Sequence, residues 1–167
     1  CLQKQRQAYH ADPVPDLAQR KQDLLTLKAM LADNREAIIA AINSDYGNRA
    51  RQETVLAEMI MVIDGFNFAL KHLKQWMKVQ RRKIEFTLYP GARNRVIPQP
   101  LGVIGVIVPW NFPVQLSFIP LTYIFAAGNR AMVKMSENSR NLTHLLIKLA
   151  PAYFPQEKLK FFEETGD

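Results

Sequence analysis

Residues 100–113 carry the sequence P-L-G-V-I-G-V-I-V-P-W-N-F-P, and this stretch decides the fold class. Its apolar, β-branched part, residues 102–108, is typical of a parallel strand that is covered on both faces. A loop of proline and aromatic residues follows, and residues 114–127 then have the composition of a helix that ends at Gly128. The stretch therefore predicts a strand, a loop and a helix, which is the repeating unit of α/β proteins.

The alternation of strand and helix continues toward the C-terminus. Residues 131–135 are expected to form a second strand, residues 138–154 a second helix and residues 159–163 a third strand. This β-α-β-α-β order predicts the first half of a Rossmann-like doubly wound sheet. Pro120 lies inside the first helix and predicts a kink or a late start, because proline lacks an amide and clashes with the preceding turn.

Toward the N-terminus, up to about residue 80, the pattern is helical. One helix is expected to start at Asp16, whose side chain can cap it while Gln19 reaches back. A second is expected to start at Asp33 and to stop at Gly47, and a third covers residues 54–77. The third has an apolar seam in steps of three and four, formed by Leu56, Met59, Ile63, Phe66, Leu70, Leu73 and Met77.

A β ribbon is expected between these helices and the sheet. Residues 84–89 alternate apolar and polar side chains, Pro90-Gly91 marks a turn, and residues 95–98 form the returning strand. Two strands alone are marginally stable, so the ribbon is expected to join a sheet elsewhere, such as one in another subunit. The predicted organisation is an N-terminal helical segment, a β ribbon and the first part of an α/β domain, at residues 1–83, 84–99 and 100–167.

The composition is that of a globular protein, with 48% hydrophobic and 22% charged residues among 167. No apolar run reaches the roughly 18–20 residues of a bilayer span, and the single cysteine, Cys1, forms no internal disulfide, so a cytoplasmic location is expected. The net charge of +7 comes from residues 71–95, where eight basic residues accompany one acid. Such a segment suits an anionic partner or is a solvated face, and no recognised nucleic-acid motif accompanies it.

Two loops, residues 109–113 and 134–137, follow the predicted strands at their carboxyl ends, where open parallel sheets bind ligands. Neither a G-x-G-x-x-G fingerprint nor a P-loop is present. Taken alone, each loop residue also has a structural interpretation: Asn111 as a helix cap, Trp110 as a core aromatic, and Lys134 with Glu137 as a surface pair. The three histidines lack metal-ligand spacing and Cys1 has no histidine near it in sequence, so they predict neither a metal site nor a nucleophile.

Taken together, the motifs P-W-N-F-P (109–113), A-A-G-N (126–129) and K-M-S-E (134–137) change this picture. Their order and spacing resemble the aldehyde dehydrogenase superfamily, and the whole chain is similar to the N-terminal third of its members. Met135 in place of the usual proline, and Pro120 in place of a frequent lysine, are similar to the coniferyl aldehyde dehydrogenase branch. The resemblance implies an incomplete aldehyde dehydrogenase fold and a coenzyme that is NAD or NADP.

The resemblance also implies roles for individual residues. Asn111 corresponds to the asparagine whose amide holds the substrate oxyanion, a charge that develops only in the transition state. Lys134 and Glu137 correspond to the pair that hydrogen-bonds the adenosine ribose of the coenzyme. The residues expected to line the coenzyme cleft are Val108, Pro109 and Trp110.

In the family, a cysteine thiolate attacks the aldehyde, hydride passes to nicotinamide, and a glutamate-activated water releases the acid. This sequence stops at Thr165-Gly166-Asp167, before the matching cysteine and glutamate, so the chain alone is expected to be the inactive N-terminal part of an enzyme that oxidises an aldehyde such as coniferaldehyde. A homo-oligomer that uses the ribbon is expected, with no nucleic-acid partner. The alternative is a non-catalytic interaction module whose basic segment, residues 71–95, binds a partner or nucleic acid.

Overall fold

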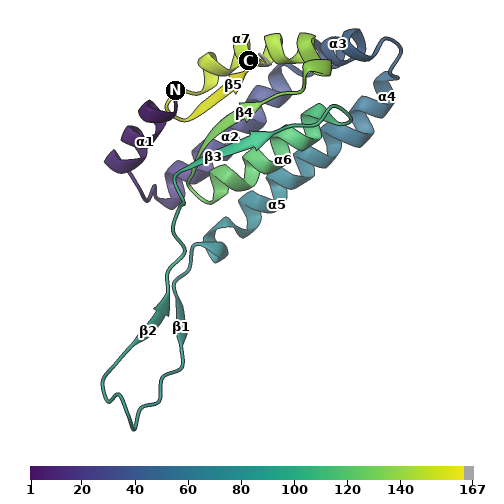
Figure 1. Cartoon of the computed structure of the whole chain (residues 1–167). Coiled ribbons are helices and arrows are strands. Elements are labelled where there is room, and N and C mark those ends of the chain that lie inside the picture. Colours follow the sequence, from purple (N-terminus) through teal and green to yellow (C-terminus); the bar gives the residue numbers. More distant parts are fainter. Residues whose placement is uncertain (164–167) are drawn as a thin grey trace.

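The computed structural model describes residues 1–163, and its centre is a parallel three-stranded sheet. The strands β3 (Val103–Ile107), β4 (Arg130–Lys134) and β5 (Leu159–Phe162) lie side by side in the order β3-β4-β5. Two helices connect them, α6 (Pro113–Ala126) and α7 (Arg140–Tyr153), and the 3-10 turn η2 (Glu137–Ser139) precedes α7 (Figure 1). The predicted α/β order is confirmed, and the last four residues of the predicted third segment lie outside the described part of the chain.

The sheet has one covered face, which corrects the prediction that β3 is covered on both. In β4 and β5, alternate side chains such as Ala131, Val133 and Phe161 are buried, while their neighbours are only half-buried. In β3, Ile107 is 80% exposed. The continuous apolar run predicted cover on both faces, but in the described chain the connecting helices α6 and α7 cover a single side.

The N-terminal helices pack on this helical layer. They are α2 (Leu17–Asp33), α3 (Arg35–Tyr46), the short α4 (Arg51–Glu53), the π-helical turn η1 (Thr54–Ile60) and α5 (Met61–Trp76). α5 contacts both α2 and α6, and α3 contacts α7. Together these helices enclose one apolar core, which includes the fully buried Leu27, Phe66 and Phe118.

The helix starts are partly as predicted. Asp16 caps α2, because its Oδ1 accepts a hydrogen bond of 2.8 Å from the Gln19 amide. The Gln19 side chain does not reach back; it donates to Asp23 one turn further on. The residue preceding α3 is Asn34 rather than Asp33, and its side chain donates to the Met30 carbonyl. α6 runs from Pro113 to Ala126 through Pro120, so the late start that Pro120 predicted is wrong, and the alternative of a kink there stays a prediction.

The apolar seam of residues 54–77 is mostly covered within the chain. Met59, Phe66 and Leu73 are buried in the core, whereas Leu56 is 63% exposed. Most of the seam therefore lies in or against the core of the molecule. The first turns of this predicted helix are the π-helical η1, a conformation that is frequent at functional sites.

One helix, α1 (Leu2–Ala11), lies outside the predicted elements. Its buried residue is polar: the Gln5 side chain donates to the carbonyls of Ala131 and Gln156, at 3.0 and 2.9 Å. These contacts place α1 at the amino ends of the strands, and Cys1 is exposed at its start. Polar contacts rather than an apolar stripe hold this helix, so the sequence shows no apolar periodicity that would predict it.

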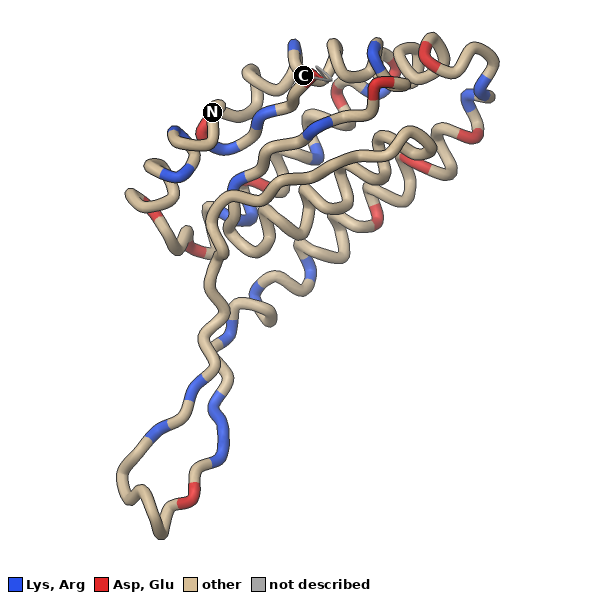
Figure 2. The backbone as a smooth tube through the Cα atoms, viewed as in Figure 1, with Lys and Arg blue, Asp and Glu red and all other residues tan. Residues whose placement is uncertain are grey.

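The ribbon forms an arm that projects from the body of the molecule (Figure 1). Its strands are β1 (Gln80–Arg82) and β2 (Asn94–Val96), which pair antiparallel with Arg81 opposite Arg95. The predicted strand at residues 84–89 is wrong. The Leu88 and Tyr89 amides both donate to the Glu85 carbonyl, and residues 85–89 are exposed, so in the described part of the chain no buried face holds an alternating strand here. Figure 2 shows Lys and Arg residues along the arm. In the sequence, Glu85 is the one acid in residues 71–95. Among the described residues, no helix is long and apolar enough to span a membrane.

Candidate functional site

The two predicted loops meet at the carboxyl edge of the sheet. The Val108 amide donates to the Lys134 carbonyl at 2.9 Å, which ties the end of β3 to the end of β4. Val108 is buried at this junction, while Pro109 and Asn111 are exposed. The chain therefore presents the P-W-N-F-P loop where ligands bind in open parallel sheets.

The structural interpretations of Trp110 and Asn111 are not supported. Trp110 is 58% exposed and so is not a core aromatic. The residue that precedes α6 is Phe112, and no side chain caps this helix from there. Within residues 1–163 the Asn111 side chain forms no hydrogen bond, so its amide is available to a ligand.

The loop of residues 134–137 contributes side chains to a pocket and to a neighbouring groove. Glu137 and Trp110 line a pocket of about 470 Å³, together with Tyr46 and Arg140. Lys134 lines a mostly apolar groove of about 310 Å³ over the uncovered face of the sheet, beside Ile107. Of the predicted coenzyme residues, Trp110 and Glu137 are thus brought together, Lys134 lies in the adjacent groove, and Val108 and Pro109 line neither.

Two residues that sequence reasoning missed, Glu58 and Arg49, lie behind the Asn111 loop. Glu58, in η1, is fully buried, and its Oε2 accepts hydrogen bonds from the Val114 and Gln115 amides at 2.6 and 3.1 Å. Its Oε1 lies 2.9 Å from Nη1 of Arg49. Burial raises the pKa of the Glu58 carboxyl, while the Gln115 amide and the Arg49 charge oppose that rise.

Arg49 precedes α4 and is held on several sides. Its Nη1 donates to the Asn111 carbonyl at 3.3 Å. Its guanidinium carbon lies 5.1 Å from the centre of the Phe112 ring and 5.4 Å from that of Tyr46, which are cation–π distances. The sequence offered one indication of this pair, which is the glutamate at position 58 beside the apolar seam. A charged side chain at such a position needs a partner if it is buried.

The A-A-G-N motif lies at the opposite, amino edge of the sheet, where its role is structural. Gly128 has a φ of +85°, and a side chain added there would meet the Arg20 guanidinium at 2.9 Å. Oδ1 of Asn129 accepts hydrogen bonds from the Leu101 and Gly102 amides, at 2.6 and 2.9 Å. The motif therefore fixes the turn from α6 into β4 and the entry of the chain into β3.

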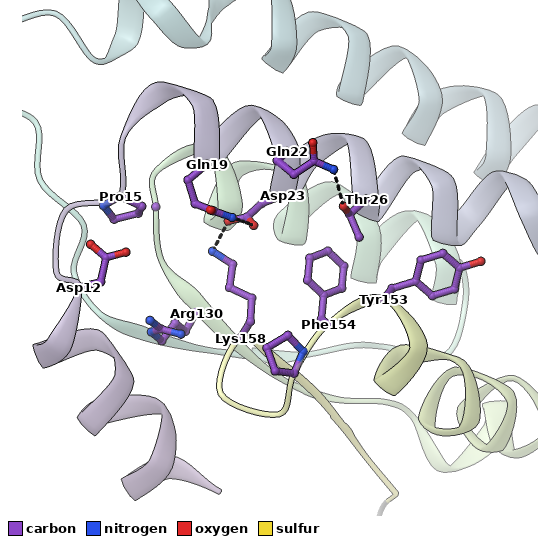
Figure 3. Close-up of a pocket in the computed structure, with 12 residues that line it drawn as sticks. Asp12, Pro15, Gln19, Gln22, Asp23, Thr26, Arg130, Tyr153, Phe154 and Lys158 are labelled. Atoms are coloured by element: carbon purple, nitrogen blue, oxygen red, sulfur yellow. Dashed lines mark hydrogen bonds and ion pairs between the residues drawn. The ribbon is translucent and has the colours of Figure 1, made fainter.

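A polar pocket of about 350 Å³ also lies at this amino edge (Figure 3). Nζ of Lys158 is 2.5 Å from Oδ2 of Asp23 and 4.7 Å from the centre of the Phe125 ring. Burial lowers the pKa of Lys158, although the Asp23 charge acts to raise it. Because the pocket lies at the other end of the strands, it is separate from the Asn111 site.

Within residues 1–163 no group of three or more histidine, cysteine and acidic side chains could hold a metal ion.

A parallel sheet with two loops at its carboxyl edge makes this an α/β protein, and in open sheets of this class ligands bind at that edge. The family model "Aldehyde dehydrogenase family" matches residues 2–167, and the chain belongs to that family. It is 45% identical over 156 residues to a "Probable coniferyl aldehyde dehydrogenase" of Pseudomonas aeruginosa, covering 93% of this chain and 33% of the relative. It is 41% identical to a coniferyl aldehyde dehydrogenase of a Pseudomonas species, covering 95% of this chain and 32% of that protein.

The fold is shared with solved structures of the family. The structure titled "Substrate bound state of Staphylococcus Aureus AldH" superposes with a TM-score of 0.91 at 25% identity, over 98% of this chain and 35% of the other. The chain spans about a third of the length of the curated relatives quoted above. The resemblance implied by the three motifs is therefore confirmed at the level of family and fold.

Proposed function

We propose that this chain is part of an NAD- or NADP-dependent aldehyde dehydrogenase that oxidises an aromatic aldehyde, such as coniferaldehyde, to the carboxylic acid. The observation that carries the proposal is the exposed Asn111 side chain at the carboxyl edge of the sheet, next to the loop after β4. The relatives named above support the substrate class. Below, "the complete enzyme" means this chain continued over the length that those relatives have.

Asn111 would act on the aldehyde carbonyl. Its side-chain amide can donate to the oxygen as negative charge develops there, and a donor fixed in advance stabilises that charge without reorganisation. Cys1 cannot serve as the attacking thiol, because α1 places it at the amino edge, away from Asn111. We therefore expect this chain alone to form no acid.

The residues at the carboxyl edge fit a dinucleotide. Glu137 offers carboxylate oxygens to ribose hydroxyls, Trp110 exposes a flat apolar ring, and the groove beside Lys134 is apolar enough for a base. The bound coenzyme would supply the hydride acceptor. A cytoplasmic location belongs to the same proposal and is supported by the single cysteine.

Replacing Glu137 or Lys134 by alanine is expected to raise the KM for NAD(P) about tenfold, which is ~1.4 kcal/mol for one lost hydrogen bond to a charged group. The kcat should change little, because neither residue would contact the aldehyde. Steady-state kinetics of the complete enzyme with varied coenzyme measures both quantities. Lys148→Ala, at an exposed position of α7, is the control. An unchanged KM in both variants would remove these residues from the coenzyme site.

We also propose that the arm joins copies of the complete enzyme into a homo-oligomer. Its tip exposes Phe86, Leu88 and Tyr89 at 68%, 70% and 63%, and both edges of the ribbon are free in the described chain. Exposed edges and apolar side chains favour association. In this proposal the basic residues of the arm face a partner subunit.

Sedimentation equilibrium at micromolar concentration is expected to show more than one copy per particle. Changing both Phe86 and Leu88 to aspartate should shift the mass to that of a single copy, because each buried carboxylate would lack a partner. Leu25→Asp, on the exposed face of α2, is the matched control. A complete enzyme that sediments as one copy would contradict this assembly.

A further inference from the structure

We infer that Arg49 and Glu58 are positioning residues, which hold the Asn111 carbonyl and the main chain that follows it so that the Asn111 side-chain amide faces the aldehyde. The inference rests on the proposed function, since it concerns the group that would contact the substrate. Neither residue lies in the P-W-N-F-P motif, and both approach it from elements far away in sequence.

Glu58 fixes the chain after Asn111. Helix α6 begins two residues beyond Asn111, and the amides of its first turn have no partner inside the helix. Oε2 of Glu58 accepts two of them, from Val114 and Gln115. These bonds fix where α6 begins and therefore how far Asn111 stands from the helix.

Arg49 fixes the Asn111 peptide itself. Its Nη1 donates to the Asn111 carbonyl, and the same nitrogen lies 2.9 Å from Oε1 of Glu58. The neighbouring Phe112 ring and the Tyr46 ring lie at cation–π distance on the same guanidinium. One buried ion pair thus holds the carbonyl of Asn111 and the amides that follow it.

The Arg49–Glu58 ion pair is better suited to fixing the backbone of the Asn111 loop than to stabilising the folded protein. A buried pair often contributes no more than apolar side chains of equal size would, because both charges lose their hydration. Here Nη2 of Arg49 has no hydrogen-bond partner among the described residues, and its Nε lies 3.5 Å from Oε1 of Glu53, an ion-pair contact without a hydrogen bond, so desolvation is incompletely offset. What the pair does provide is a fixed position of the Asn111 carbonyl relative to the first turn of α6.

The test compares Arg49→Lys and Glu58→Gln with Asn111→Ala in the complete enzyme. Lysine keeps the charge but lacks the planar fork, and glutamine keeps an oxygen acceptor but loses the charge. Each is expected to lower kcat by about 10- to 100-fold, the size expected for a small displacement of a catalytic group. The KM for the coenzyme should stay within about twofold. Arg51→Lys and Glu36→Gln, which alter an exposed ion pair nearby, are the matched controls and should leave kcat unchanged.

A double-mutant cycle separates positioning from a general structural role. If Glu58 acts through Asn111, Glu58→Gln should lower kcat by less than about twofold once Asn111 is alanine. Hydrogen exchange should rise in Glu58→Gln at residues 111–118 and stay unchanged in α2. If the Glu58→Gln variant does not fold, the same cycle with Arg49→Lys distinguishes a positioning role from a general structural role.

Three results would overturn the inference. A normal kcat in Arg49→Lys and Glu58→Gln, together with a lowered kcat in Asn111→Ala, would overturn this inference and leave the proposed function standing. The inference would also be overturned if Glu58→Gln or Arg49→Lys lowered kcat by the same factor with alanine at position 111 as with asparagine there. An unchanged kcat in Asn111→Ala would overturn the oxyanion role in the proposed function, and the inference would fall with it.

Discussion

Replacing Asn111 by alanine is expected to lower the kcat of the complete enzyme by about 10²–10³-fold, the usual loss for one oxyanion donor. The side chain is exposed at the carboxyl edge of the sheet and forms no hydrogen bond within residues 1–163, so its removal costs little stability. The KM for NAD(P) should stay the same, because the coenzyme contacts are assigned to other residues. Steady-state kinetics at saturating coenzyme and varied aldehyde measures the effect.

Asn43→Ala, at an exposed position of α3, is the control for the loss of a surface amide. It should leave kcat unchanged. A near-normal kcat in Asn111→Ala would show that this side chain does not contact the reacting carbonyl. Since Asn111 does not cap α6, its exposed place in the loop would then have no functional explanation.

Replacing Asp23 by alanine is expected to destabilise the protein by about 3–5 kcal/mol, because it leaves a buried ammonium without its counter-charge. The side chains of Asp23 and Lys158 are 9% and 11% exposed, and the Phe125 ring would be the remaining contact of the charge. Urea unfolding of the complete enzyme measures the change. Glu36→Ala, which removes the exposed ion pair with Arg51, should cost at most ~1 kcal/mol.

The effect of Asp23→Ala should depend on pH in a defined direction. Burial already lowers the pKa of Lys158 from its ordinary 10.5, and loss of the Asp23 charge lowers it further. As the pH rises toward 10.5, the native state then loses this proton before the unfolded state does, so the unfolded state binds more protons and stability increases with pH. The destabilisation by Asp23→Ala should therefore shrink between neutral and alkaline pH. A constant difference would show that Lys158 is not a buried charge.

The elements that could be predicted from the sequence are those whose signals are local. The apolar runs of β3, β4 and β5, and the cap at Asp16, each depend on residues close together in the chain. The position of the Asn111 loop follows from the same pattern, because strands in parallel order place their carboxyl ends at one edge. The assignment of Lys134, Glu137 and Asn111 to roles came from the family resemblance, and those roles stay predictions.

The features that escaped prediction depend on contacts between distant residues. The alternation in residues 84–89 indicated a strand, but alternation fixes a strand only where one face is buried, and in the described structure residues 85–89 are exposed. Glu58 and Arg49 meet the Asn111 loop from η1 and from the residues before α4, and no spacing rule connects the three. Likewise α1 is held by the polar contacts of Gln5, which leave no periodic mark in the sequence.

The most direct test of the proposed function is the stoichiometry of the reaction. The complete enzyme is incubated with coniferaldehyde and either NAD or NADP, the acid is quantified by chromatography, and the reduced coenzyme by its fluorescence. The account predicts acid and reduced coenzyme in equal amounts with at least one of the two coenzymes, and a rate that falls about 10²–10³-fold in Asn111→Ala. Formation of neither product with either coenzyme or with other aromatic aldehydes, by a folded complete enzyme, would contradict it.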